Sequence, residues 1–190
     1  TFDISEDGTN SGRVTYTSSE SPVVSDGQDL HLKITLDADD SSNSTVKFYT
    51  SSDGVNWAQL GNKVQSGAVV SIFESTAEIT IGSVDAGTQS VDGKIHRLKI
   101  LNDIDGQVVL DFDPVMHTHG SSFYGRTGEK YTAQGNAAIH GYDMNVVVGT
   151  AANLRKSVSG ACLFYGSNGD FASTPDSVAN SITGDIDLRS

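Results

Sequence analysis

The chain has 190 residues with a formal net charge of −12 at pH 7, and it contains 20 Gly, 3 Pro and a single Cys. This length predicts about one domain with a core of its own, and the many small polar residues predict frequent turns. The acidic excess argues against a nucleic-acid partner, no apolar run is long enough for membrane insertion, and one cysteine supports neither an intrachain disulfide nor a cysteine-based zinc site.

Alternation of apolar and polar residues, the pattern of a β-strand, recurs along the first part of the chain. The clearest example is 30–36, where every second residue is Leu or Ile. Further strands are predicted in chain order at 13–17, 45–51, 57–61, 69–73, 77–82, 93–101 and 107–113. Because these runs are short and separated by turn residues, they indicate an all-β sandwich or jelly roll.

From residue 114 the alternation weakens. We interpret 114–160 as a loop-rich segment, with short strands predicted at 129–132, 137–140 and 145–149 and one or two helical turns at 151–156. The tail is predicted to form two strands around a turn, at 161–165 and 184–189. The expected organisation is therefore a sandwich core over 1–113, the loop-rich segment 114–160, and closing strands within 161–190.

Two blocks of sequence carry a family resemblance. The first is 26–60, including Leu32–Asp37 and the run from Val46 to Leu60; the second is Gly169–Asp176 followed by Ile182–Arg189. Together they resemble the concanavalin A-like (laminin-G-like) jelly-roll domain of bacteriophage structural proteins. The first block is similar to the family's central hairpin and the second to its opening strands. The resemblance implies a jelly-roll sandwich with a loop-rich C-terminal extension.

The order of the two blocks differs from the family's order, because the block that opens the family domain closes this chain. Thr1–Thr9 resembles a strand and turn from the middle of the domain. We therefore expect a processed product or a piece of a longer repeat protein. The tail strands are expected to complete a sandwich, either that of the same chain or that of a neighbour. An open jelly roll exposes strand edges that pair with other chains, so we expect a homo-oligomer with strand exchange.

The resemblance implies a virion structural protein rather than an enzyme. It would be a capsid-decorating, tail or fibre component on the virion exterior that binds other virion proteins and adheres to host glycans. The alternative is a carbohydrate-binding, lectin-like module of a secreted, extracellular bacterial protein. Neither interpretation requires a cofactor.

Aromatic residues are the candidates for ligand contact. Tyr124, Tyr131 and Tyr142 lie in the loop-rich segment and are predicted to contact a protein partner or a glycan. Trp57, with Phe48 and Tyr49 nearby, is the other candidate. The Trp either forms a sugar-stacking platform or packs in the sandwich core, and the family resemblance favours the core.

Two patterns resemble metal sites. His117 and His119 are two residues apart, so on a strand both imidazoles point the same way and can reach a transition metal, given a third ligand such as His140, His31 or a symmetry copy. The turn with Asp103 and Asp105 offers carboxylates to calcium, as does the acidic turn 37–40. Neither turn contains a complete calcium loop, and Asp is common in turns because it bonds its own backbone.

Catalytic patterns are absent from the sequence. Jelly-roll enzymes that cleave β-glucans carry the pattern Glu-x-Asp-x-x-Glu, which places two carboxyl groups on one strand. That pattern does not occur in this sequence. Glu74 and Glu78 are close in sequence but lie around a turn. There is no Gly-x-Ser-x-Gly elbow, and Cys162 lies in an apolar run that predicts a buried, inert thiol.

Overall fold

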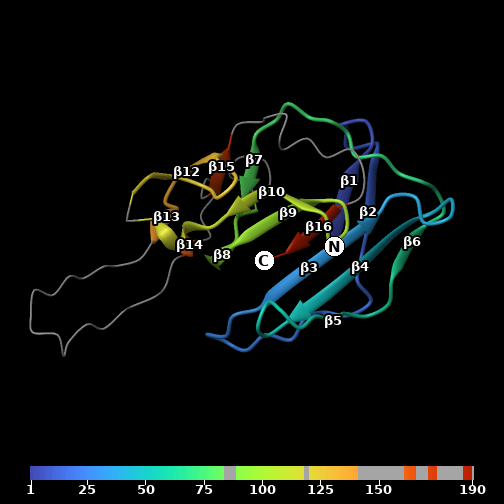
Figure 1. Cartoon of the computed structure of the whole chain (residues 1–190), viewed down its shortest axis with the longest axis horizontal. Coiled ribbons are helices and arrows are strands. Elements are labelled where there is room, and N and C mark those ends of the chain that lie inside the picture. The colour runs from blue at the N-terminus through green and yellow to red at the C-terminus, as the bar shows by residue number, and fades with distance from the viewer. Residues whose placement is uncertain (84–88, 118–119, 141–160, 166–170, 175–185, 190) are drawn as a thin grey trace, which may run out of the picture. The chain divides into compact units, whose positions relative to one another are not determined.

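The computed structural model describes residues 1–83, 89–117, 120–140, 161–165, 171–174 and 186–189 (Figure 1). Regular structure in these ranges is β-strand, apart from one short 3-10 helix, η1 (Pro114–Met116), so the prediction of an all-β fold is confirmed. No helix in these ranges is long and apolar enough to span a membrane. The strands are β1 (Phe2–Ser5), β2 (Arg13–Tyr16), β3 (His31–Asp37), β4 (Ser44–Ser51), β5 (Ala58–Gln59), β6 (Val64–Ser66), β7 (Ile79–Ile81), β8 (Asp92–Ile95), β9 (Leu98–Asn102), β10 (Gln107–Phe112), β11 (Ser122–Tyr124), β12 (Lys130–Gln134), β13 (Ala138–His140), β14 (Ala161–Tyr165), β15 (Phe171–Thr174) and β16 (Ile186–Arg189).

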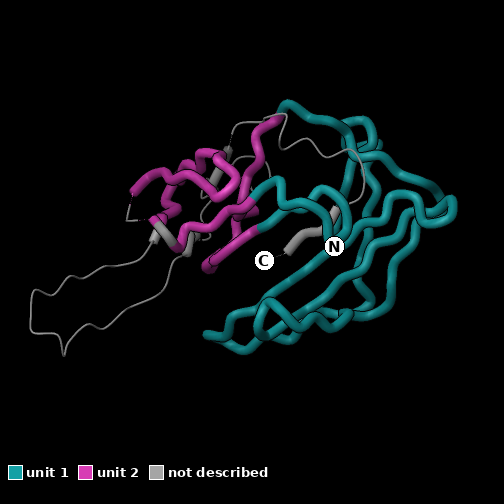
Figure 2. The backbone as a smooth tube through the Cα atoms, viewed as in Figure 1, with its two compact units in different colours: residues 1–76, 99–110, 176–190 teal, residues 77–98, 111–175 magenta. Residues whose placement is uncertain are grey.

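Contacts divide the chain into two compact units (Figure 2). Unit 1 comprises 1–76, 99–110 and 176–190, and unit 2 comprises 77–98 and 111–175. Both units draw on residues from either side of position 113, because strands far apart in sequence pair within each of them. This grouping therefore cuts across the sequence-based boundaries at residues 113 and 160.

Unit 1 is built on a sheet whose described strands run in the order β10-β9-β16-β3-β4-β5, with β6 also pairing with β4; we term it the large sheet. β3 and β4 pair antiparallel, from His31 opposite Ser51 to Asp37 opposite Thr45. Leu36 lies opposite Val46, and both side chains are fully buried. The alternation read from 30–36 thus identifies the face of the sheet that packs inward.

The C-terminal strand β16 lies in the interior of the large sheet. Asp187 pairs with Thr35 of β3 on one side and with Leu101 of β9 on the other, and both pairings are antiparallel. In this structure the tail therefore completes the sheet of its own chain, which is one of the two arrangements expected from the sequence.

A hairpin of β1 and β2 covers part of the inward face of the large sheet. Ile4 and Tyr16 from the hairpin form the core cluster of unit 1 together with Leu36, Val46 and Phe48 of the sheet. The Tyr16 hydroxyl shares a buried hydrogen bond of 2.7 Å with the Ser44 hydroxyl. This bond connects β2 of the hairpin to the first residue of β4.

Two predicted strands differ from the structure. Residues 69–73 form no strand, because their hydrogen bonds go to different segments: the Val70 N–H donates to the Ala38 carbonyl and the Phe73 N–H to the Ser5 carbonyl. The predicted strand 93–101 is divided into β8, which pairs with β14, and β9, which pairs with β16. The chain changes sheets between them.

Unit 2 contains two sheets among its described strands, β11-β12-β15-β7 and β13-β14-β8. Its core holds an aromatic cluster of Phe112, Phe123 and Tyr131, whose ring centroids lie 5.0–5.3 Å apart. β11 was not predicted from the sequence; it supplies Phe123, which lies opposite Tyr131 of β12. The predicted strand 145–149 and the helical turns at 151–156 lie outside the described residues.

Candidate functional site

The face of the large sheet opposite the core cluster carries a lysine beside two aromatic rings. Lys33 of β3 and Tyr49 of β4 are cross-strand neighbours. Because side chains alternate along a strand, Lys33 and Tyr49 lie on the other face of the sheet from Ile34 and Phe48. The Lys33 Nζ lies 4.6 Å from the centroid of the Tyr49 ring and 5.3 Å from that of Trp57. We term Lys33, Tyr49 and Trp57 the aromatic–lysine site.

All three side chains of this site are partly buried, which leaves part of each accessible to a ligand. The favoured expectation that Trp57 packs in the sandwich core is therefore wrong: Trp57 is absent from the core cluster of unit 1 and contacts Lys33 instead. The physical reason is that Trp57 directly precedes β5, where Gln59 pairs with Tyr49, so the chain returns along the outer side of the hairpin.

The loop between β4 and β5 positions Trp57. Its centre is the Asp53 carboxylate, which accepts hydrogen bonds from the N–H groups of Val55 and Asn56, from the Asn56 side chain and from the Ser51 hydroxyl. These bonds, first of all the one from the Asn56 backbone, hold the pKa of Asp53 well below its ordinary value of 3.8. Gly54 follows with φ +70, a left-handed conformation that suits glycine.

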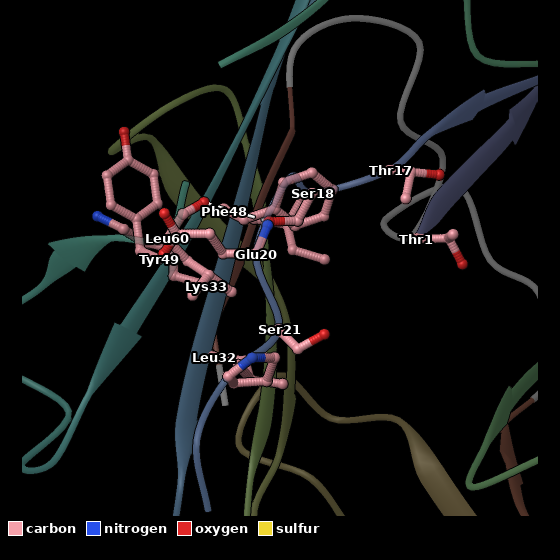
Figure 3. Close-up of a pocket in the computed structure, with 12 residues that line it drawn as sticks. Thr1, Thr17, Ser18, Glu20, Ser21, Leu32, Lys33, Phe48, Tyr49 and Leu60 are labelled. Carbon is pink, nitrogen blue, oxygen red and sulfur yellow. Dashed lines mark hydrogen bonds between the residues drawn. The ribbon is translucent and has the colours of Figure 1, made fainter. Parts of the chain in front are cut away.

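A crevice of about 290 Å³ opens in unit 1 between residues 17–22 and strands β3 and β4 (Figure 3). Its apolar lining includes Leu32, Ile34, Phe48 and Leu60, and its polar lining includes Thr17, Ser18, Glu20 and Ser21. In Figure 3 the Tyr49 ring points away from Thr17 and Ser21. Lys33 and Tyr49 also line the crevice, so it adjoins the aromatic–lysine site.

Two ion pairs form the most charged cluster described in unit 2. Arg97 donates from Nε and Nη2 to the two carboxylate oxygens of Asp111, at 2.9 and 2.7 Å. Arg126 Nε donates to Asp113 at 2.7 Å, and Arg97 Nη2 lies 3.9 Å from the same carboxylate. The hydrogen bond with Asp111 is the main cause that raises the Arg97 pKa. Both carboxylates are buried and paired with guanidinium groups. The cluster therefore holds Arg97 and Arg126 against the end of β10.

The predicted metal ligands that the structure describes belong to no metal-binding cluster. Asp103 and Asp105 lie in the turn between β9 and β10 with φ values of 87 and 57, and the Asp103 carboxylate accepts a bond from the Ile104 N–H. The His117 ring packs on Phe123 with centroids 4.8 Å apart, and His119 lies outside the described residues. Over the ranges that the structure describes, no group of three or more His, Cys, Asp or Glu is placed to hold a metal.

The predicted ligand-binding tyrosines have different environments. Tyr124 on β11 is 62% exposed, whereas Tyr131 on β12 is fully buried in the aromatic cluster, and this burial raises its pKa. Tyr131 is thus unsuited to the surface contact expected of it, because it lies opposite Phe123 on the inward face of its sheet. Tyr142 lies outside the described residues.

Sequence reasoning did not single out Lys33. The only signal was its position on the polar side of an alternating strand, and its neighbours Tyr49 and Trp57 become visible only once the register of β3, β4 and β5 is known.

Glu74 and Glu78, the carboxylates closest in sequence to a catalytic spacing, are both exposed. Cys162 lies on β14, at the register position between Ile139 and Ile95.

Comparison with known proteins gives no relative for this chain: no protein-family model, no curated protein and no solved structure matches it.

Proposed function

We propose that the chain is a non-enzymatic, concanavalin A-like jelly-roll module of a bacteriophage virion exterior, and that it acts by binding neighbouring subunits. The resemblance of 26–60 and 169–189 to phage structural domains supports the virion setting. The position of β16 in the interior of the large sheet is the observation that carries the subunit contact.

Without β16, the strands β3 and β9 would both have unpaired edges in the middle of the sheet. The edges would extend over Lys33–Leu36 and Lys99–Asn102, the residues that β16 pairs with. Unpaired strand edges recruit strands from other chains. A β16 supplied by a second copy makes the same backbone hydrogen bonds as one supplied by the same chain, so exchange links subunits without any new interface.

The mass of the particles in solution tests this proposal. Light scattering on the full chain, with and without a chelator, is expected to give a closed oligomer or a polymer. Dissociation by the chelator would show that a metal contributes to the subunit contact, and would bring His117 and His119 or the acidic turns back into consideration. A monomer that is indifferent to concentration and to chelator would contradict the proposal.

The second candidate function is carbohydrate binding, as a virion adhesin or as a secreted lectin-like module. The aromatic–lysine site favours it, because aromatic rings beside polar side chains pack against the C–H faces of sugars. Affinity electrophoresis in gels that contain polysaccharides would detect binding. Tyr49→Ala is expected to abolish retardation and Tyr124→Ala to preserve it. The opposite result would move the ligand to the loop-rich segment.

A further inference from the structure

A row of basic residues crosses the large sheet at the aromatic–lysine site. Lys99 of β9 is the register partner of Arg189, and Arg189 is in turn the partner of Lys33, which pairs with Tyr49. We term Lys99, Arg189 and Lys33 the basic row. Neighbouring strands lie about 4.8 Å apart, so the backbones of Lys33 and Lys99 are separated by about 10 Å.

The basic row concentrates positive charge in an acidic chain. The chain has only 12 Lys and Arg against 24 Asp and Glu, yet three of the basic residues occupy adjacent positions in one row. Like charges at opposed positions of neighbouring strands destabilise a sheet. Outside β16, whose Asp187 lies on the same face as Arg189, no described carboxylate forms an ion pair with Lys33 or Lys99.

We propose that the basic row and the aromatic pair together bind an anionic saccharide, a sugar chain that bears carboxylate or sulfate groups. Tyr49 and Trp57 supply flat apolar surfaces for sugar rings, and the lysines of the basic row supply charge-assisted hydrogen bonds to the acidic groups. This inference rests on the second candidate function and names the class of ligand for the same site.

The basic row is complementary in charge to a short anionic saccharide, even though the chain as a whole has a net charge of −12. At physiological ionic strength the screening length is about 8 Å, so distant carboxylates of the protein repel a bound saccharide weakly. The basic row lies within contact distance of the ligand and is screened much less.

The test uses one saccharide in two charge states. Calorimetric titrations of the full chain with oligogalacturonate and with its methyl ester compare carboxylate and neutral forms of the same sugar chain. The dissociation constant of the wild type for the acid form is expected to be lower than that for the methyl ester by about tenfold or more. A sulfated dextran oligosaccharide beside unmodified dextran makes the same comparison for sulfate.

Two double variants locate the effect. Lys33→Gln with Lys99→Gln is expected to remove the preference for the acid form, whereas Lys94→Gln with Lys130→Gln, the same change of charge on exposed positions of unit 2, is expected to retain it. The melting temperature of the first variant is measured as a folding control, because Lys33→Gln removes both a like-charge repulsion and the cation–π contacts with Tyr49 and Trp57. The single variant Lys99→Gln, outside the aromatic contacts, is expected to weaken the preference in part.

The outcomes separate the inference from the function on which it rests. Equal binding of acid and neutral forms would overturn the anionic class and leave carbohydrate binding in place. Equal loss of preference in both double variants would overturn the site. Binding of neither form to the wild type would overturn both the inference and the carbohydrate-binding candidate.

Discussion

At the scale of single residues, the two fully buried tyrosines differ in how their hydroxyls are satisfied. The Tyr16 hydroxyl is bonded to Ser44, whereas the buried Tyr131 hydroxyl has no hydrogen-bond partner among the residues described. Tyr16→Phe is therefore expected to lower the free energy of unfolding by about 1–2 kcal/mol, because it leaves the Ser44 hydroxyl buried and unpaired. Tyr131→Phe should leave it unchanged or raise it by up to about 1 kcal/mol.

Urea denaturation of both variants measures this contrast, and each variant serves as the control for the other because the chemical change is the same. An equal loss of stability in the two variants would show that Tyr131 has a partner after all. Tyr131 would then contribute a hydrogen bond to the core as well as its aromatic packing.

A second residue-scale prediction concerns pH and the loop that positions Trp57. The folded-state pKa of Asp53 is depressed, so its contribution to stability is present above the ordinary pKa of 3.8 and is lost as pH falls toward the folded value. Asp53→Ala should therefore melt lower than the wild type at pH 7, and the difference should shrink as pH falls below 3.8.

Thermal melts from neutral to strongly acidic pH give this comparison. Asp26→Ala is a suitable control, because it removes an exposed carboxylate with no described side-chain bond. A difference between wild type and Asp53→Ala that stays constant across the acidic range would contradict the role assigned to the ionised carboxylate.

Residue-scale expectations succeeded where the cause was local. Turn residues were expected to separate the predicted strands 45–51 and 57–61, and Asp53 organises that loop through bonds to its neighbours in sequence. The burial of Tyr131 depends on its pairing with Phe123 and on the packing of Phe112, which are set by distant parts of the chain. Weak alternation around 131 gave no sign of this.

At the scale of elements, the Arg97–Asp111 pair holds together the point where the chain changes sheets. Arg97→Gln is expected to cost about 2 kcal/mol of unfolding free energy, less than for a fully buried pair because the Arg97 side chain is 37% exposed. Adding Asp111→Asn should recover part of the loss, since no buried carboxylate then remains unpaired.

A double-mutant cycle on chemical denaturation curves gives the coupling between the two side chains. Additive losses in the double variant would mean that the two side chains act independently. The Arg97–Asp111 pair would then not explain why β8 and β9 separate at 96–97.

Elements were predictable where alternation is strong. β3, β4 and β10 were found close to their predicted limits, because each alternates along its own length. Residues 93–101 also alternate, but the ion pair of Arg97 and the different partners of β8 and β9 divide the run. Such partners are non-local, so a single run of sequence does not reveal them.

At the scale of the whole molecule, the all-β class followed from many short alternating runs, and the structure confirms it. The aromatic–lysine site and the basic row did not follow, because they exist only through the register of strands separated by many residues. β16 shows the same limit: its sequence predicted a strand, and its place between β3 and β9 required the structure.

The measurement closest to the central claim asks which chain supplies β16. Thr35 and Asp187 are register partners, so cysteines at these positions come close enough to form a disulfide. One variant carries Thr35→Cys and the other Asp187→Cys, each with Cys162→Ala to remove the only natural thiol. The two are unfolded together, refolded and oxidised, with Gln65→Cys replacing Thr35→Cys as a control on another strand of the sheet.

Strand exchange predicts disulfide-linked dimers that contain one chain of each kind, and no such dimers with the Gln65→Cys control. If the mixed chains stay monomeric, while Thr35→Cys and Asp187→Cys in one chain form an intrachain disulfide, β16 closes its own sheet. That result would contradict assembly through β16.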